Sequence, residues 1–191
     1  NHVGGSGGAV CISYANASHF IMNGGTISDC TATSYGGAVY MYKGGGISIK
    51  GGVISNCKAA SMGGAVMAWD GKVDMSGGSV EGCKAANGSG IYIYTNASMT
   101  MSGGTIANCS GENGLKGVKG GGIRIHTANG LTMTGGTIVG CSAEYGGGIY
   151  TEIEQSVQLD GGTISKCQAN YGGAIYAAAA QAVTMHKGTL S

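Results

Sequence analysis

The sequence contains no proline, one phenylalanine and few charged residues, and no long apolar run. Without proline, and without glycine at every third position, a collagen triple helix is excluded. Charged residues make up 10% of the chain and the formal net charge is +1. This balance gives no electrostatic reason to expect nucleic acid or an anionic membrane surface as a partner.

No apolar stretch approaches the length of about 18 residues that a membrane-spanning helix requires, so we expect no membrane span in this segment. The chain begins at Asn1 in polar, glycine-rich sequence that does not resemble a signal peptide. Both ends fall inside a repeat. We therefore expect a segment of a longer protein or a processed product.

Glycine is the most abundant feature, with 41 of 191 residues, while 42% of residues are hydrophobic. So much glycine would suggest disorder in a polar chain, but this apolar content is sufficient for a core. The length fits a single domain over residues 1–191. Many tight turns, repeated along one domain, are the expected result.

Two glycine motifs recur along the chain. Gly-Gly-(Ala/Gly)-(Val/Ile) begins at Gly7, Gly36, Gly63, Gly120, Gly146 and Gly172, with a variant at Gly88. Gly-Gly-Thr-Ile or a close relative begins at Gly24, Gly51, Gly77, Gly103, Gly135 and Gly161. A cysteine stands six residues after each glycine of the second set: Cys30, Cys57, Cys83, Cys109, Cys141 and Cys167. Successive cysteines are 27, 26, 26, 32 and 26 residues apart, which defines a repeat of about 26 residues.

Each repeat contains short runs in which apolar and polar residues alternate, as in 39–42, 47–49 and 99–101. A period of two over such short runs indicates half-buried strands. Three short strands per repeat predict one coil of a solenoid, paired with the next coil about 4.8 Å away. We expect an all-β, right-handed parallel β-helix of about seven coils. A left-handed hexapeptide helix fits the period poorly, and a leucine-rich framework is absent.

The repeats resemble those of large bacterial surface proteins with β-helical stalks. Gly-Gly-Ala-Ile resembles the repeats of polymorphic outer-membrane proteins, and Gly25-Thr26-Ile27-Ser28 resembles those of adhesin-like surface proteins. In the latter, Asn usually occupies the place where this sequence has Cys. The resemblance implies a secreted, surface-attached protein and leaves its ligand open.

The cysteine column admits three interpretations. The thiols are buried as small apolar groups, or neighbouring cysteines form disulfides, because adjacent coils bring their Cα atoms within bonding range. Metal binding is disfavoured, since the spacing of a tetrahedral site is missing. Cys11 lies outside the column, and we expect no cofactor or metal.

Outward positions of the first strand gather aromatic residues on one face. The candidate binding residues are Tyr40, Tyr42, Trp69, Tyr92 and Tyr94. Exposed strands favour aromatic residues for structural reasons alone. Tyrosine and tryptophan are also preferred anchors for sugar rings and partner proteins.

Catalysis has one candidate, in which Arg124 and His126 stand beside Tyr150 and Glu152, with Glu154 further along the strand. No pair of aspartates accompanies them, so we expect no enzyme. Ice binding would need two regular threonine columns. The outward residues two positions after the threonine column read Ser28, Ser55, Glu81, Ala107, Val139 and Ser165, which breaks the array.

The sequence thus favours a non-enzymatic, extracellular or cell-surface solenoid that acts as a stalk or adhesin, with glycans or a surface protein as partner. The alternatives are a filament subunit that stacks coil on coil, because solenoid ends need caps, and a carbohydrate-binding or polysaccharide-active β-helix. Ice binding is the weakest of them.

Overall fold

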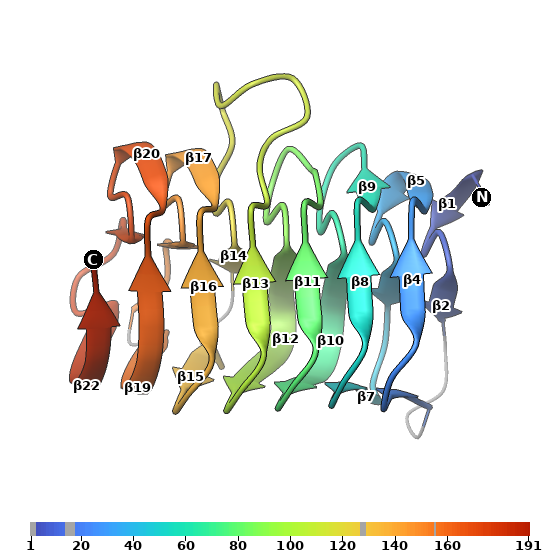
Figure 1. Ribbon diagram of the computed structural model, residues 1–191, viewed down its shortest axis with the longest axis horizontal. Coiled ribbons are helices and arrows are strands. Elements are labelled where there is room, and N and C mark those ends of the chain that lie inside the picture. Colours follow the sequence, from blue (N-terminus) through green and yellow to red (C-terminus); the bar gives the residue numbers. More distant parts are fainter. Residues whose placement is uncertain (1–2, 14–17, 127–128, 155) are drawn as a thin grey trace.

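A computed structural model describes residues 3–13, 18–126, 129–154 and 156–191 of the chain. The chain winds into stacked coils, with its two ends at opposite ends of the stack (Figure 1). The described residues contain only strands, turns and bends, and all strand pairs are parallel. Accordingly, no helix in this part of the chain is able to span a membrane. The predicted β-solenoid of about seven coils is confirmed.

Three strand positions repeat from coil to coil, as the alternation predicted. The first position holds β2 (Val10–Ile12), β6 (Val39–Met41), β14 (Ile123–His126), β18 (Ile149–Thr151) and β21 (Ile175–Ala177). The second holds β3 (His19–Met22), β7 (Gly46–Ile49) and β15 (Leu131–Met133). The third holds β4 (Thr26–Ser28), β8 (Val53–Ser55), β11 (Ser79–Glu81), β13 (Thr105–Ala107) and β16 (Thr137–Val139). Longer strands join two positions: β10 (Val66–Met75), β12 (Ile91–Met101), β19 (Val157–Ser165) and β22 (Val183–Leu190).

A fourth position, just after the cysteine, was not predicted. It holds β1 (Val3–Ser6), β5 (Thr31–Tyr35), β9 (Lys58–Ala59), β17 (Ser142–Tyr145) and β20 (Gln168–Tyr171). Between β9 and β17 the coils are joined here by isolated bridges, such as Lys84 with Ser110. These segments are short and their polar residues dominate, so that a period of two is hard to recognise in them.

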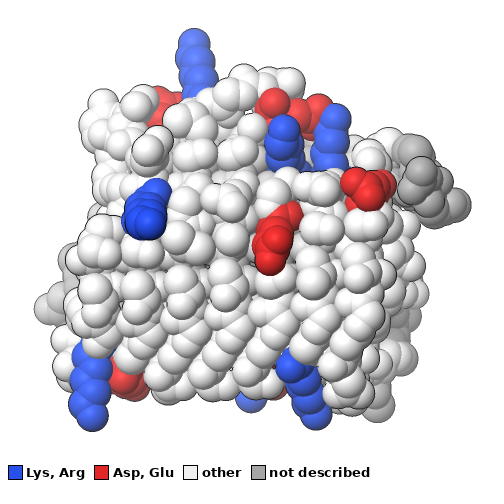
Figure 2. Space-filling model, in the orientation of Figure 1, with Lys and Arg blue, Asp and Glu red and all other residues white. Residues whose placement is uncertain are grey.

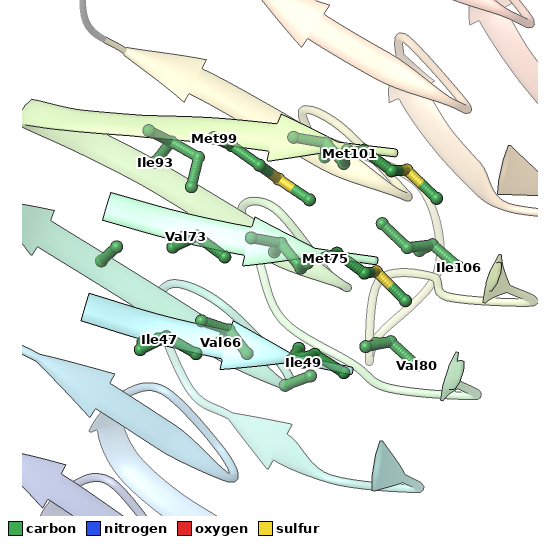
Figure 3. Close-up of a cluster of buried hydrophobic side chains, with 14 of the residues drawn as sticks. Ile47, Ile49, Val66, Val73, Met75, Val80, Ile93, Met99, Met101 and Ile106 are labelled. Atoms are coloured by element: carbon green, nitrogen blue, oxygen red, sulfur yellow. The ribbon is translucent and has the colours of Figure 1, made fainter. Parts of the chain in front are cut away.

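The register places equivalent residues on top of one another. Val66 of β10 pairs with Val39 on one side and Ile91 on the other. Figure 3 shows the result inside the coils, where aliphatic and methionine side chains from the first, second and third strand positions point toward one another. Ile47, Ile49 and Met101 are fully buried. Each such side chain contributes about 1.5–3 kcal/mol by leaving water.

The second glycine of the Gly-Gly-Thr-Ile motif is required for two reasons. Gly104 has φ of 80°, in the left-handed region that favours glycine. A Cβ added at Gly104 would lie 2.6 Å from the carbonyl oxygen of Gly77 and 2.7 Å from Cε of Met75, both in the preceding coil. The corner therefore leaves room for the tip of a methionine from the neighbouring coil.

The outward face of the third strand position is flat and carries few charges (Figure 2). Thr105 pairs with Ser79 on one side and Thr137 on the other, which forms the predicted hydroxyl-rich column. Two residues further along, Glu81 pairs with Ala107. The second column therefore has the irregular order that the sequence predicted for it.

Replacing Gly104 by alanine tests whether the neighbouring coil leaves room for a side chain at this corner. Gly104→Ala should destabilise the fold by about 1–3 kcal/mol beyond the backbone cost, because the added methyl group has no room. Gly114→Ala is the matched control, since Gly114 also has positive φ, at 92°, but open space around its Cβ position. Urea denaturation of both variants measures the difference. Equal midpoints would show that the neighbouring methionine imposes no constraint.

Candidate functional site

Each cysteine of the column sits directly after a residue in the left-handed region, as at Asn56 (φ 52°) and Asn108 (φ 53°). This turn directs the thiol into the coil. Sγ of Cys109 lies 3.4 Å from the carbonyl oxygen of Ala107 and 3.9 Å from that of Val80, in the preceding coil, so either oxygen is within reach of the single thiol hydrogen. Four other thiols, those of Cys57, Cys83, Cys141 and Cys167, repeat both contacts.

The column is composed of free thiols, and Cys11 is also free but exposed. Hydrogen bonds with the thiols of Cys141 and Cys83, together with burial, raise the pKa of Cys109 well above its ordinary value. Gly90 packs on this thiol, because a Cβ at Gly90 would lie 3.4 Å from Sγ of Cys109. A protonated, buried thiol is a poor nucleophile. Cys109 therefore contributes to packing, and burial shields Cys57, Cys83 and Cys141 in the same column from solvent.

Outside the coils, aromatic side chains gather on one side of the solenoid, which we call the aromatic face. It contains the chain's tryptophan and every tyrosine in the described ranges: Tyr35, Tyr40, Tyr42, Trp69, Tyr92, Tyr94, Tyr145, Tyr150, Tyr171 and Tyr176. The five aromatic residues singled out from the sequence all belong to it. They are neighbours because β6, β10 and β12 pair in register.

Tyr40 and Tyr92 point outward but are buried, with exposed fractions of 8% and 1%. Together with Met67 they form a second apolar cluster, separate from the core inside the coils. Tyr35 covers this cluster from the far side of the Gly-Gly corner, with its ring centroid 5.8 Å from that of Tyr40 and 6.1 Å from that of Trp69. The side chains of Tyr40 and Tyr92 therefore point out of the coil without being exposed to solvent.

Of the five aromatic residues singled out from the sequence, Tyr42, Trp69 and Tyr94 are half-exposed. The Trp69 ring lies 5.9 Å from that of Tyr42 and 4.6 Å from that of Tyr94. Between Ala68 and Asp70 the pairing of β10 with β12 shifts, so Trp69 sits at an irregularity of the ladder. Such bulges redirect a side chain. The indole of Trp69 is therefore oriented differently from the neighbouring tyrosine rings of the row.

A further row of the aromatic face was not predicted from the sequence and contains Tyr35, Tyr145 and Tyr171. Each of the three directly precedes a Gly-Gly corner, and that position is the signal that would have found them. The rings of Tyr145 and Tyr171 stack at 5.0 Å, and those of Tyr150 and Tyr176 at 5.5 Å. The aromatic face therefore extends to the last coil.

A charged cluster interrupts the aromatic face in its middle. The guanidinium of Arg124 lies 5.1 Å from the ring centroid of Tyr92 and 5.4 Å from that of Tyr150, which joins the two halves by cation–π contacts. Arg124 Nη2 also donates to Glu152 at 3.1 Å. Arg124 Nε is buried and has no hydrogen-bond partner in the described part of the chain. The arginine is thus mainly a structural link between coils.

Glu152 accepts hydrogen bonds from several donors around it. Tyr150 Oη donates at 2.9 Å, and Nδ1 of His126 also contacts the carboxylate. Burial alone would raise the pKa of Glu152, but the hydrogen bond from Tyr150 and the charge of Arg124 outweigh it and lower this pKa. Burial raises the pKa of Tyr92 to about 12. Near neutral pH the carboxyl group of Glu152 is therefore ionised and the hydroxyl group of Tyr92 is protonated.

The geometry of this cluster gives little support to catalysis. The structure brings Arg124, His126, Tyr150 and Glu152 together, as the sequence suggested, whereas Glu154 is exposed. Hydrolysis of a glycosidic bond ordinarily requires two carboxyl groups on either side of the bond. Here one carboxylate is surrounded by donors that keep it ionised. In the described ranges, no group of three or more histidine, cysteine or acidic residues could hold a metal ion.

Comparison with known proteins gives one match. A family described as the right handed beta helix region matches residues 1–142 and, in a second overlapping match, residues 72–191. No curated protein matches the chain. No solved structure matches it either.

The cysteine column predicts a sharp difference in thiol reactivity. In the native protein, Ellman's reagent should label Cys11 rapidly and leave Cys83 and Cys109 unlabelled, because burial excludes both water and reagent. All seven should react in denaturant. Cys11→Ser should remove the rapid phase. Rapid native labelling of Cys83 or Cys109, located by mass spectrometry, would show that the column opens.

The lowered pKa of Glu152 predicts a pH-dependent contribution to stability. A carboxylate whose pKa is lower in the folded state stabilises the fold above its ordinary pKa of 4.5 and loses this contribution as the pH falls through the folded value. The difference in unfolding free energy between wild type and Glu152→Gln should therefore be largest near neutral pH and shrink in acid. Denaturation at several pH values measures it. A difference that stays constant with pH would contradict this assignment.

Proposed function

Because the chain belongs to the family of right-handed β-helix regions, we propose that it is a non-enzymatic segment of a secreted or cell-surface protein. In this role it serves as a rigid stalk with an adhesive aromatic face. The proposal is supported by the fold, by the aromatic face, and by the donors Arg124, His126 and Tyr150 that occupy the carboxylate of Glu152.

Adhesion is carried by one observation, the half-exposed row of Tyr42, Trp69 and Tyr94. Tyrosine and tryptophan supply large contact areas and are enriched where binding energy concentrates. The neighbouring rings already restrict these side chains, with Trp69 and Tyr94 at 4.6 Å. Binding therefore costs less side-chain entropy than it would for isolated rings. Sugar rings and flat protein surfaces are the matching partners, and glycans are the first class to test.

The stalk role is supported by the way in which the coils are joined. In the inner coils, strands at the first three positions pair in parallel with the coil before and the coil after, as Val80 does with Ile54 and Ile106. Each coil adds about 4.8 Å of length, and its stability comes from its two neighbours. A longer array of such coils would hold an adhesive surface at a fixed distance from its point of attachment.

A glycan array tests the adhesive role. The wild-type chain should bind a subset of glycans, and a variant with Tyr42, Trp69 and Tyr94 all changed to alanine should lose at least about tenfold in affinity, since three anchors are removed. The matched control changes Ile21 and Met185 to alanine, which are exposed apolar residues outside the aromatic face. This control should bind as the wild type does.

Circular dichroism of both variants verifies that the coils remain folded. Equal binding by the wild type and the aromatic variant would remove the aromatic face as the adhesive surface. Absence of binding to any glycan, followed by capture of a purified surface protein through the same three residues, would keep the adhesive role and change the partner class.

A further inference from the structure

The one long insertion in the repeat, 111–119, forms a loop between β13 and β14 that projects beyond the rim of the solenoid (Figure 1). The loop turns back along the stack. Glu112 forms an ion pair with Lys58, which belongs to a coil two turns earlier. Backbone bridges connect Lys58 to Lys84 and Lys84 to Ser110, so the ion pair passes over an intervening coil. The loop is thereby fastened above three coils.

Beneath the loop lies a cavity of about 430 Å³, within the usual range for a small-ligand site. It is lined by Asn56, Cys57, Lys58, Gly82, Lys84, Glu112 and Asn113. A smaller cavity of about 150 Å³ lies on the other side of Glu112 and Asn113. The larger cavity has amide, carboxylate and ammonium groups and no aromatic side chain. Its chemistry therefore matches a ligand with many hydroxyl groups and not an apolar one.

The cavity also has an excess of positive charge. Lys58 and Lys84 occupy equivalent positions in neighbouring coils, where like charges repel. Glu112 pairs with Lys58, but within the described ranges no carboxylate lies within ion-pair distance of Lys84. Charged side chains gather along this rim of the molecule, in contrast to the nearly uncharged sheet beside it (Figure 2). An anionic group placed between the two lysines would relieve their repulsion.

We propose that this cavity binds an acidic saccharide, with a sugar carboxylate held by Lys84 and Lys58. The amides of Asn56 and Asn113 are placed to hydrogen-bond the sugar hydroxyls. Glu112 competes with the ligand for Lys58, so that it limits the affinity. This site is separate from the aromatic face, and it does not depend on the adhesive role proposed above.

Isothermal titration calorimetry of the whole chain tests the proposal, with tri-galacturonate as the probe. A neutral galactose trisaccharide and inorganic phosphate are the comparison ligands. We expect saturable one-site binding of the acidic sugar, much weaker binding of both comparison ligands, and loss of affinity at high salt because the contact is ionic.

Three variants sharpen the test. Lys84→Gln should weaken binding about tenfold or more, whereas Glu112→Gln should strengthen it, because the competing carboxylate is gone. Lys50→Gln is the matched control, since Lys50 is an exposed lysine at the corner between β7 and β8. It should leave the affinity unchanged. If the loop only covers the coils and binds no ligand, Lys84→Gln and Glu112→Gln would not change the affinity in opposite directions.

Several results would overturn the proposal: no heat of binding, equal affinity for the neutral trisaccharide, or equal affinity of wild type and Lys84→Gln. Phosphate binding as tight as tri-galacturonate would overturn the saccharide assignment and leave only a general anion site. The variant lacking Tyr42, Trp69 and Tyr94 should bind tri-galacturonate normally. Failure at this cavity is therefore distinguishable from failure of the adhesive face.

Discussion

Every part of this molecule depends on the in-register pairing of each coil with the next. When Val66 pairs with Val39 and Ile91, the side chains that follow also fall on their equivalents. A column then behaves as a unit, because any side chain must fit the same residue position above and below it. The cysteine column, the methionine tips at the glycine corners and the aromatic face are three results of this single constraint.

Stacking also explains why the repeat tolerates so few residue types at its corners. Gly104 must adopt positive φ and must leave room for Met75 of the preceding coil. The turn before Cys109 uses Asn108 in the same left-handed region, where asparagine is one of the few tolerated side-chain residues. Composition thus follows from geometry: a chain with a corner every few residues needs much glycine and little bulk outside its strands.

The first three strand positions, the period and the partners in each outward column could be predicted, because they depend on residue spacing that is visible in the sequence. Burial of Tyr40 and Tyr92 could not be predicted, because Tyr35 covers Tyr40 from across a corner and Arg124 of the next coil lies over Tyr92. The same limit applies to Glu112, whose partner Lys58 stands far earlier in the sequence. Alternation of apolar and polar residues shows to which side of a strand a side chain points. Only the folded structure shows which residues cover it there.

The aromatic face has a mechanical consequence. Force along the axis of such a rod must peel one coil from the next, and each step breaks a ladder of backbone hydrogen bonds. Where rings from neighbouring coils also touch, as Trp69 and Tyr94 do at 4.6 Å, peeling must in addition pull apart an external seam. Arg124, held between Tyr92 and Tyr150, joins the two halves of that seam. The rod is therefore reinforced along one side, so it should resist bending away from that side more than bending toward it.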